Sequence, residues 1–286
     1  MEITLSLDFK NFGVIFLKKV IRRWDMKRKW KMGKRVGWVL AVFLYPAVVF
    51  SHHALEYLDV ESYSIAGKKE AIFYLRHDYF VDDKSDASLD HWEFTPGISY
   101  GILKRVMFDI HIHLSKFGSG HIEEGQEASP FFEALAPSVI IQLTGYKQLP
   151  VDIALSLCYE YPFHRSRKLI GGTHTFEGKF ILSRDFGVHS NITLNAGGSV
   201  DENGDYEIVW MLGAKTPLTS QAHGIAAGIE IEGTHTEEEH AFIFLPGIYF
   251  PVLQNIRLKA GLGAGFTLNE KTIWTEKMAV QLMYIF

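Results

Sequence analysis

The chain has 286 residues, of which 47% are hydrophobic and 14% aromatic, and its formal net charge is −4 with histidine counted as neutral. Cys158 is the single cysteine, which excludes an intramolecular disulfide. Positive charge is concentrated near the amino terminus, so residues 52–286 have a net charge of about −12. This disfavours a nucleic-acid partner, because phosphate neutralisation needs clustered lysine and arginine.

Residues 1–51 have the pattern of a leader with a secretory signal peptide, whose core is about 26–51. A basic run precedes an apolar stretch over 36–50, which is shorter than the roughly 20 residues that a membrane-spanning helix needs. Cleavage is expected after Ser51, and retention as an inner-membrane anchor is the competing fate. Translation can start at any of three methionines: Met1, Met26 or Met32.

Residues 52–68 are predicted to form a periplasmic segment ahead of the folded body. From Lys69 onward, apolar residues recur at every second position. Because successive side chains of a strand point to opposite faces, this period predicts strands with one apolar and one mixed face. Twelve are predicted, around 70–78, 91–101, 106–115, 135–142, 151–160, 176–182, 190–196, 206–214, 225–231, 242–250, 258–266 and 277–286.

The last ten residues show this pattern clearly. Lys277 and Gln281 lie on the mixed face. The apolar face carries Met278, Val280, Leu282, Tyr284 and Phe286. Such alternation is typical of a transmembrane barrel strand. A terminal aromatic residue resembles the signal by which bacterial outer-membrane barrels reach their assembly machinery, which makes Phe286 the candidate contact with that machinery.

Glycines on the mixed faces are expected where the walls of a narrow lumen come close. The predicted connections also alternate between short ones and longer ones rich in charge, glycine or histidine, as in outer-membrane barrels. We therefore predict that residues 69–286 form an all-β fold, a closed antiparallel transmembrane β-barrel of about twelve strands. It would lie in the outer-membrane lipid of a Gram-negative bacterium, with both termini periplasmic because the strand number is even.

Three prolines, Pro96, Pro137 and Pro246, fall inside predicted strands. Proline cannot donate to the hydrogen-bond ladder, and a closed barrel has no edge strand. A β-bulge or local bend is therefore predicted at each.

Charged and histidine side chains on the mixed faces are the candidate lumen-lining, solute-selecting residues: Arg76, Asp78, Glu93, Asp109, His111, His113, Glu177, Lys179, Arg257 and Lys259. Their opposed charges would either form a transverse field that selects solutes or pair across strands and hold the barrel in shape.

A metal site is one interpretation of the histidines. Asp109, His111 and His113 alternate along one strand face and are potential ligands of zinc or copper, with help from Glu93. The alternative is a polar pore that histidine merely lines. Two other histidine groups have the same two interpretations: His235 and His240 beside the acidic run 237–239, and His52 with His53.

No catalytic site and no cofactor are predicted, and the chain has no phosphate-cradling Gly-Lys-Ser/Thr loop. Some twelve-stranded outer-membrane barrels are phospholipases, and His189 and Ser190 supply the residue types. Adjacent side chains of a strand point to opposite faces, so His189 cannot reach Ser190 as its base.

The stretch Glu61-Ser62-Tyr63-Ser64, followed by Asp-His-Trp-Glu-Phe-Thr-Pro-Gly-Ile-Ser-Tyr-Gly at 90–101, resembles the front of barrels grouped with the meta-pathway phenol-degradation proteins. That family is usually described as outer-membrane transporters. The resemblance implies passive passage of small, aromatic or hydrophobic solutes and no catalytic residues. The thirteen histidines depart from it and leave metal-related transport open. A structural or adhesive surface barrel is the alternative to a channel.

Overall fold

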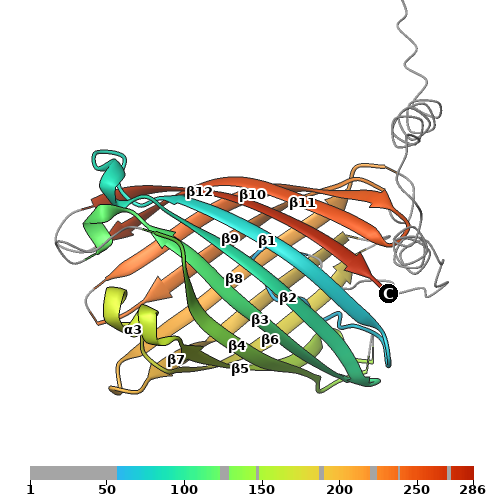
Figure 1. The fold of residues 1–286 in the computed structure, drawn as a ribbon. Helices are drawn as coiled ribbons and strands as arrows, with labels where there is room; N and C mark the ends of the chain where they lie inside the picture. The colour runs from blue at the N-terminus through green and yellow to red at the C-terminus, as the bar shows by residue number, and fades with distance from the viewer. Residues whose placement is uncertain are drawn as a thin grey trace, which may run out of the picture. The chain divides into compact units, whose positions relative to one another are not determined.

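The structure, a computed structural model, describes residues 57–122, 129–145, 148–186, 190–219, 224–237, 239–268 and 272–286. Most of these residues lie in twelve strands (Figure 1). The strands are β1 Ala71–Val81, β2 His91–Leu103, β3 Val106–Phe117, β4 Phe131–Gln142, β5 Asp152–Pro162, β6 Thr175–Phe186, β7 Ser190–Asp201, β8 Tyr206–Pro217, β9 Ala226–His235, β10 His240–Leu253, β11 Ile256–Leu268 and β12 Thr272–Ile285. Three short helical turns join them: η1 Ala87–Leu89, η2 Ser119–His121 and α3 His164–Ile170. None of the helices in these ranges combines the length and apolarity needed to span a membrane.

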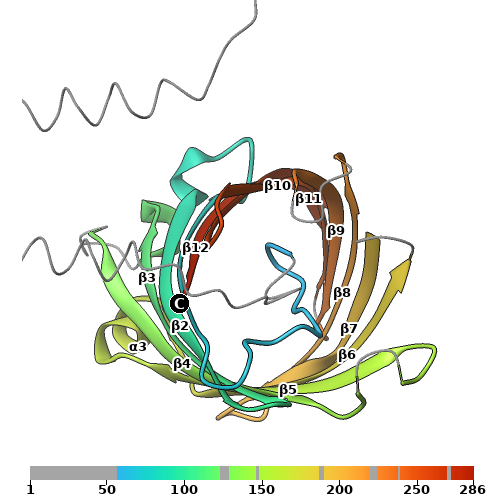
Figure 2. The same ribbon diagram turned by 90° about the vertical axis from the view of Figure 1, so that its right-hand side faces the viewer.

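Every strand pairs with its sequence neighbours in antiparallel fashion, and β1 pairs with β12, which closes the sheet into a barrel (Figure 2). At the seam Ile72 lies opposite Ile285, and the pairing continues to Val81 opposite Glu276. The backbones of Ala71 and Phe286 exchange hydrogen bonds of 2.8 and 2.9 Å. The predicted all-β, closed, twelve-stranded antiparallel barrel is confirmed.

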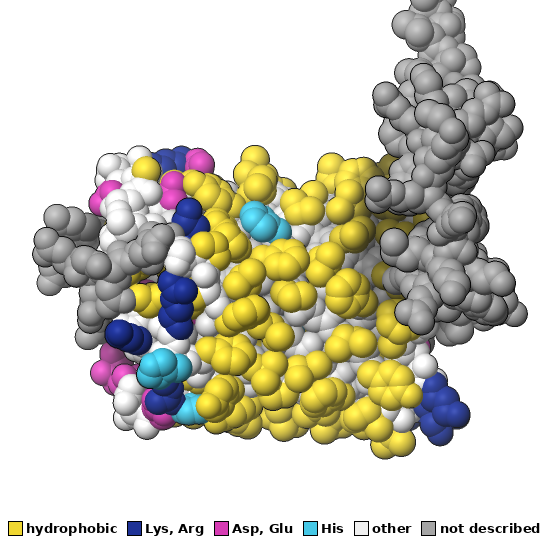
Figure 3. Space-filling view, in the orientation of Figure 1, with side chains coloured by type: hydrophobic (Ala, Val, Ile, Leu, Met, Phe, Trp, Pro, Cys, Tyr) yellow, Lys and Arg dark blue, Asp and Glu magenta, His cyan; other side chains and the backbone are white. Residues whose placement is uncertain are grey.

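Side chains alternate between the interior and the outer surface along each strand. On β12, Lys277 and Gln281 are buried, whereas Met278 and Leu282 are each 42% exposed. Figure 3 shows one outer face covered mainly by hydrophobic side chains, with most charged ones gathered at the end that carries α3. Apolar surface of this extent is typical of a protein that meets an apolar partner or a lipid phase.

No β-bulge is found at the three prolines, so the first of the two predicted alternatives is wrong and the local bend stays a prediction. Each proline keeps a partner in unbroken register on one neighbouring strand: Pro96 opposite Leu75, Pro137 opposite Ile110, and Pro246 opposite Ile229. On the other neighbour the pairing skips the proline and resumes in the same register. The missing N–H therefore interrupts one ladder locally without inserting a residue. Register shifts occur elsewhere, between Gly101 and Leu103, His113 and Leu114, and Pro251 and Leu253.

The two ends of the barrel differ. Figure 1 shows α3 at the end opposite the carboxyl terminus. The loops that contain η1 and η2 follow β1 and β3, strands that run in the same direction as β5, which precedes α3. At the other end, β2 joins β3 and β10 joins β11 through two-residue turns. We call the end with η1, η2 and α3 the loop end.

Candidate functional site

Residues 57–66 lie inside the barrel, and we call them the lumen segment (Figure 2). Tyr57, Leu58, Val60, Tyr63 and Ala66 are all buried. The expectation from sequence had placed these residues within a periplasmic segment, 52–68, ahead of the barrel. They form no strand, so the period-two pattern carried no signal of where they lie.

Wall side chains satisfy the backbone of the lumen segment. The Glu230 carboxylate on β9 accepts hydrogen bonds from the N–H groups of Leu58, Asp59 and Val60 at 2.7, 2.7 and 2.8 Å. On β7, the Asn195 side chain accepts from the N–H of Glu61 at 2.6 Å and donates to its carbonyl at 3.0 Å. Buried backbone groups outside a sheet need such partners, so these contacts fix the path of the segment.

Two acidic side chains of the lumen segment meet cations of the wall. Asp59 pairs with Arg76 on β1 and lies 3.0 Å from the Lys277 ammonium on β12. Glu61 lies 2.7 Å from the Lys179 ammonium on β6. Asp59 and Lys277 are each only 6% exposed, so Asp59 depends on Lys277 and Arg76 together for the compensation of its charge.

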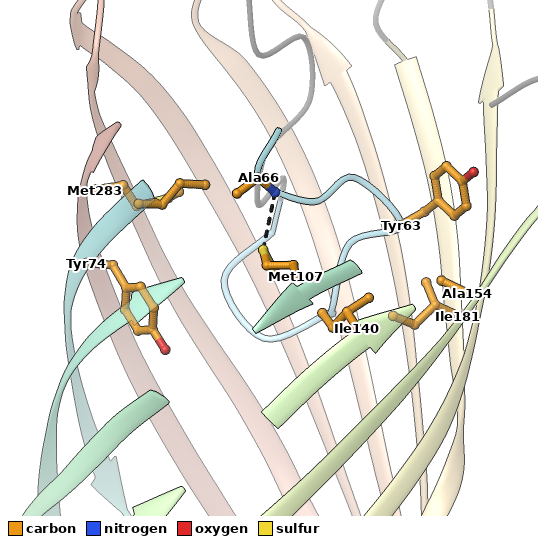
Figure 4. Packing of buried hydrophobic residues seen from close by; sticks show 9 residues of the cluster. Tyr63, Ala66, Tyr74, Met107, Ile140, Ala154, Ile181 and Met283 are labelled. Atoms are coloured by element: carbon orange, nitrogen blue, oxygen red, sulfur yellow. Dashed lines mark hydrogen bonds between the residues drawn. The ribbon is translucent and has the colours of Figure 1, made fainter. Parts of the chain in front are cut away.

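The carboxyl-terminal half of the lumen segment is held by apolar contacts (Figure 4). Tyr63 and Ala66 pack in a buried cluster with wall residues that include Ile72, Tyr74, Met107, Ile140, Ala154, Ile181 and Met283. The N–H of Ala66 donates to the Met107 sulfur at 3.2 Å, and the Tyr63 hydroxyl donates to the Thr144 carbonyl at 2.8 Å. The segment is thus anchored by polar groups at one end and by packing at the other.

Beside the lumen segment is a cavity of about 440 Å³. Three cations line it, Arg76, Lys179 and Lys277, and each is paired with an acid of the lumen segment. Eight carboxylates line it: Asp59, Glu61, Asp78, Glu93, Asp109, Glu160, Glu177 and Glu232. A second cavity of about 400 Å³ shares Glu160 and Glu177 with the first. Among described residues, its only charged lining groups are carboxylates: Glu160, Glu177, Asp201, Asp205 and Glu207. Both spaces are therefore predominantly acidic.

Most of the predicted lumen residues lie on the wall of the first cavity: Arg76, Asp78, Glu93, Asp109, His111, His113, Glu177 and Lys179. Lys259 lies under the lumen segment and donates to the Tyr57 carbonyl at 2.5 Å, and Arg257 precedes it on β11. The opposed charges contact one another, with 2.5 Å between Arg76 Nε and Asp78 and 2.7 Å between Lys179 and Glu177. Both pairs lie within a single strand, β1 and β6, so the predicted pairing across neighbouring strands stays a prediction.

The proposed metal ligands on β3 have partners of their own. Asp109 accepts hydrogen bonds from the hydroxyls of Tyr74 at 3.0 Å and Ser99 at 2.6 Å, and lies 2.8 Å from His111 Nδ1. His113 pairs through Nδ1 with Glu93 on β2. A metal at this place would have to displace those contacts.

The remaining candidates fall at strand ends. The Ser190 hydroxyl lies 3.0 Å from that of Thr216, and His189 is outside the described residues. The Nδ1 atoms of His235 and His240 are 3.0 Å apart. His52 and His53 are also outside the described residues.

Sequence reasoning missed Asp59, Glu61 and Glu230 as site residues. Glu230 could have been noted as an acid at an inward position of a predicted strand. The two acids of the lumen segment offered no such pattern, because their partners Arg76, Lys277 and Lys179 are distant in the chain.

No protein-family model matches the chain, and no curated protein sequence matches it. Solved structures do match. The fold is similar to that of an outer membrane channel from Pseudomonas putida F1. The two chains are 10% identical, with a TM-score of 0.55 over 82% of this chain and 99% of the other. The KdgM porin in complex with disordered oligogalacturonate is 9% identical, with a TM-score of 0.48 over 74% of this chain and 98% of that one. The CymD monoaromatic hydrocarbon channel is 7% identical, with a TM-score of 0.43 over 76% and 88%. The likeness to the Pseudomonas putida channel shows a shared fold and nothing more.

Proposed function

We propose that this barrel is an outer-membrane channel of a Gram-negative bacterium through which small solutes diffuse. The observation that carries the proposal is an acid-lined space inside a closed barrel whose exterior is apolar. Transmembrane barrels have this inside-out distribution of polarity. The shared fold with a channel of Pseudomonas putida F1 supports the same function.

In this proposal the loop end faces the outside, and both termini lie on the periplasmic side with the short turns. The apolar belt contacts outer-membrane lipid, residues 1–51 are removed on secretion, and Phe286 engages the assembly machinery. What supports this orientation is the difference between the two ends, because outer-membrane barrels have short periplasmic turns and longer external loops.

We propose that the channel prefers small hydrophilic cations. The wall cations Arg76, Lys179 and Lys277 are engaged by the lumen segment, so the remaining carboxylates dominate the field that a solute meets. Rings of acidic side chains select cations in other channels. The aromatic or hydrophobic solutes implied by the meta-pathway resemblance remain a prediction, as does a function in metal-related transport, and neither has a supporting contact among the lumen residues that the structure describes.

Planar-bilayer recording of the purified protein tests the proposal. A salt gradient should give single-channel currents whose reversal potential indicates cation preference, and a small aromatic cation and its neutral analogue can be compared as blockers. Currents with anion preference would contradict the proposed preference for cations but not the proposed channel. A silent bilayer with correctly folded protein would contradict the channel.

A structural or adhesive surface barrel is the second candidate. The specific observation in its favour is the lumen segment, which occupies part of the interior and is anchored by Glu230, Lys179 and Lys277. A permanently closed barrel should pass no current even when the loops are intact. The same recording therefore separates the two functions. No catalytic role is proposed for either.

A further inference from the structure

Two histidines and one aspartate from three separate segments converge at the loop end of the barrel. Asp82 follows β1, His91 begins β2, and His121 ends η2. One potential ligand atom from each lies within 4.8 Å of the other two. His91 Nδ1 is 2.5 Å and His121 Nε2 is 3.2 Å from the same Asp82 oxygen, Oδ2. Both imidazoles are thus directed at one carboxylate.

Aromatic side chains hold the two imidazoles in place. His91 is stacked between Phe80, with ring centroids 4.4 Å apart, and Phe117, at 5.1 Å, and the rings are nearly parallel on both sides. His121 packs edge-on against the same Phe117 at 5.4 Å. Packing that fixes the orientation of a ligand before the ion arrives is a general feature of metal sites.

The loops that carry the three residues are also fastened together. The Gly118 N–H donates to the Asp90 carbonyl at 2.8 Å, and a Cβ at Gly118 would lie 2.0 Å from the Ser88 carbonyl oxygen, so only glycine permits this approach. His121 Nε2 also lies 2.6 Å from the Leu89 carbonyl oxygen, a contact that an ion bound at Nε2 would replace. The site therefore has a defined geometry although it lies in loops.

The group remains open to ions from solution. Side-chain exposures are 19% for His91, 27% for Asp82 and 31% for His121. The adjacent Asp83 adds a second carboxylate beside the group. A cation approaching this end meets a field that favours binding.

We propose that Asp82, His91 and His121 form a site for a divalent transition-metal ion such as Zn²⁺. Two imidazoles and one carboxylate are a ligand set that zinc takes with water in the fourth position. Tetrahedral bonds of about 2.1 Å place ligand atoms roughly 3.4 Å apart. To bind the ion, the ligand atoms of Asp82 and His91, now 2.5 Å apart, must move apart by about 1 Å. The ligand atoms that are farthest apart, within 4.8 Å, must approach one another by at most about 1.4 Å. An imidazole binds a metal ion only in its neutral form, so binding weakens at acidic pH.

This site is distinct from the group Asp109, His111 and His113, which faces the lumen on β3, because its three residues lie at the loop end of the barrel. It does not depend on conduction, because an ion can bind at the loop end whether or not the lumen is open. Binding and currents are measured separately, so failure of one proposal is distinguishable from failure of the other.

The test uses the full chain without a polyhistidine tag, folded in detergent and stripped with a chelator. Zn²⁺ is titrated by calorimetry, and Co²⁺ by its visible absorption, for the wild type and for His91→Ala, His121→Ala and Asp82→Asn. His164→Ala is the matched control, because His164 is an exposed histidine on α3 at the same end. Wild type and control should bind one equivalent that each of the three variants loses or binds at least tenfold more weakly. Undiminished binding in both histidine variants, or no binding in the wild type, would overturn the proposal.

A second measurement avoids variants, since removing His91 from between two phenyl rings can disturb folding. Wild-type protein is treated with diethyl pyrocarbonate with and without Zn²⁺, and modified histidines are located by mass spectrometry. Zn²⁺ should protect His91 and His121 severalfold and leave His164 unprotected. Equal modification of His91 and His121 in the two conditions would show that the pair only joins the loops.

Discussion

Glu61 of the lumen segment lies 2.7 Å from the Lys179 ammonium on β6, and Glu177 lies at the same distance from that ammonium. Lys179 is only 7% exposed, so its charge is neutralised within the protein. The contact is one of three, among the described residues, in which an acidic side chain of the lumen segment pairs with a cation of the barrel wall. What remains for a solute is the carboxylate-rich wall, and the predictions below test both parts of that arrangement.

The ion pair between Lys277 and the lumen segment should be essential for stability. Lys277→Met removes one of the two cations that face the buried Asp59, at 3.0 Å, and takes from Glu232 the ammonium that lies 3.6 Å away. We expect the free energy of unfolding in urea to fall by about 3–5 kcal/mol. Lys84→Met is the control, because the Lys84–Glu276 pair is about half exposed and should contribute under about 1 kcal/mol. Equal losses in the two variants would contradict the structural importance of Lys277.

Glu230 should hold the lumen segment across the pore. Glu230→Gln replaces one acceptor oxygen by an amide that cannot accept from Leu58, Asp59 and Val60 together. We expect larger and noisier single-channel currents, because the segment loses its anchor. Glu237→Gln alters an exposed acid in the next loop and should leave the currents unchanged. Identical traces for wild type and Glu230→Gln would mean that the segment does not limit conduction.

The second cavity, whose described charged lining groups are carboxylates, should make the channel prefer cations over anions. Glu160→Gln combined with Glu207→Gln removes two carboxylates from its wall. Each removed charge changes the energy of a nearby monovalent cation by about 1 kcal/mol, the value for unit charges about 4 Å apart in water. The reversal potential in a salt gradient should therefore move toward zero. Glu202→Gln serves as control, since Glu202 pairs with Arg167 and does not line either cavity; a shift as large in that variant would contradict the assignment.

Gly101 should be required for the exit of the lumen segment into β1. A Cβ at Gly101 would lie 2.0 Å from the Gly67 carbonyl oxygen and 2.6 Å from that of Ala66. Gly101→Ala is expected to lower the free energy of unfolding by about 1–3 kcal/mol, as for overpacking elsewhere. In Gly178→Ala the new Cβ meets only the Leu157 side chain at 3.5 Å. Urea midpoints that rank the variants in the opposite order would refute this.

Phe286→Ala tests the proposed assembly signal. The Phe286 side chain is half exposed, and its backbone rather than its side chain pairs with Ala71. Stability after refolding in detergent should therefore change little, whereas the amount assembled in the outer membrane should fall severalfold. Leu282→Ala, an exposed change on the same face of β12, is expected to affect neither. Loss of both stability and assembly in Phe286→Ala would point to a structural role instead.

Periodicity was sufficient for the strands because alternation is a local property of an extended chain. Lys277 and Met278 face opposite sides whatever the rest of the molecule does, so the apolar exterior of β12 could be predicted from ten residues. Closure of the barrel is predicted because an open sheet would leave the first and last strands with unpaired backbone groups at its edges. The prolines show the limit of local rules. A bulge or a local bend is predicted at Pro96, but the ladder to β3 omits Thr95 and Pro96 and resumes in the same register without a bulge.

The sequence by itself determined which side chains face inward, because the face of each residue depends only on its place in the strand. Only the tertiary structure decided which of them meet. Glu230 holding Val60, Lys277 holding Asp59, and His91 directed with His121 at Asp82 join residues from different strands and loops. No pattern within one segment encodes such pairs, since they arise when the barrel closes and brings distant positions of the wall around the same space.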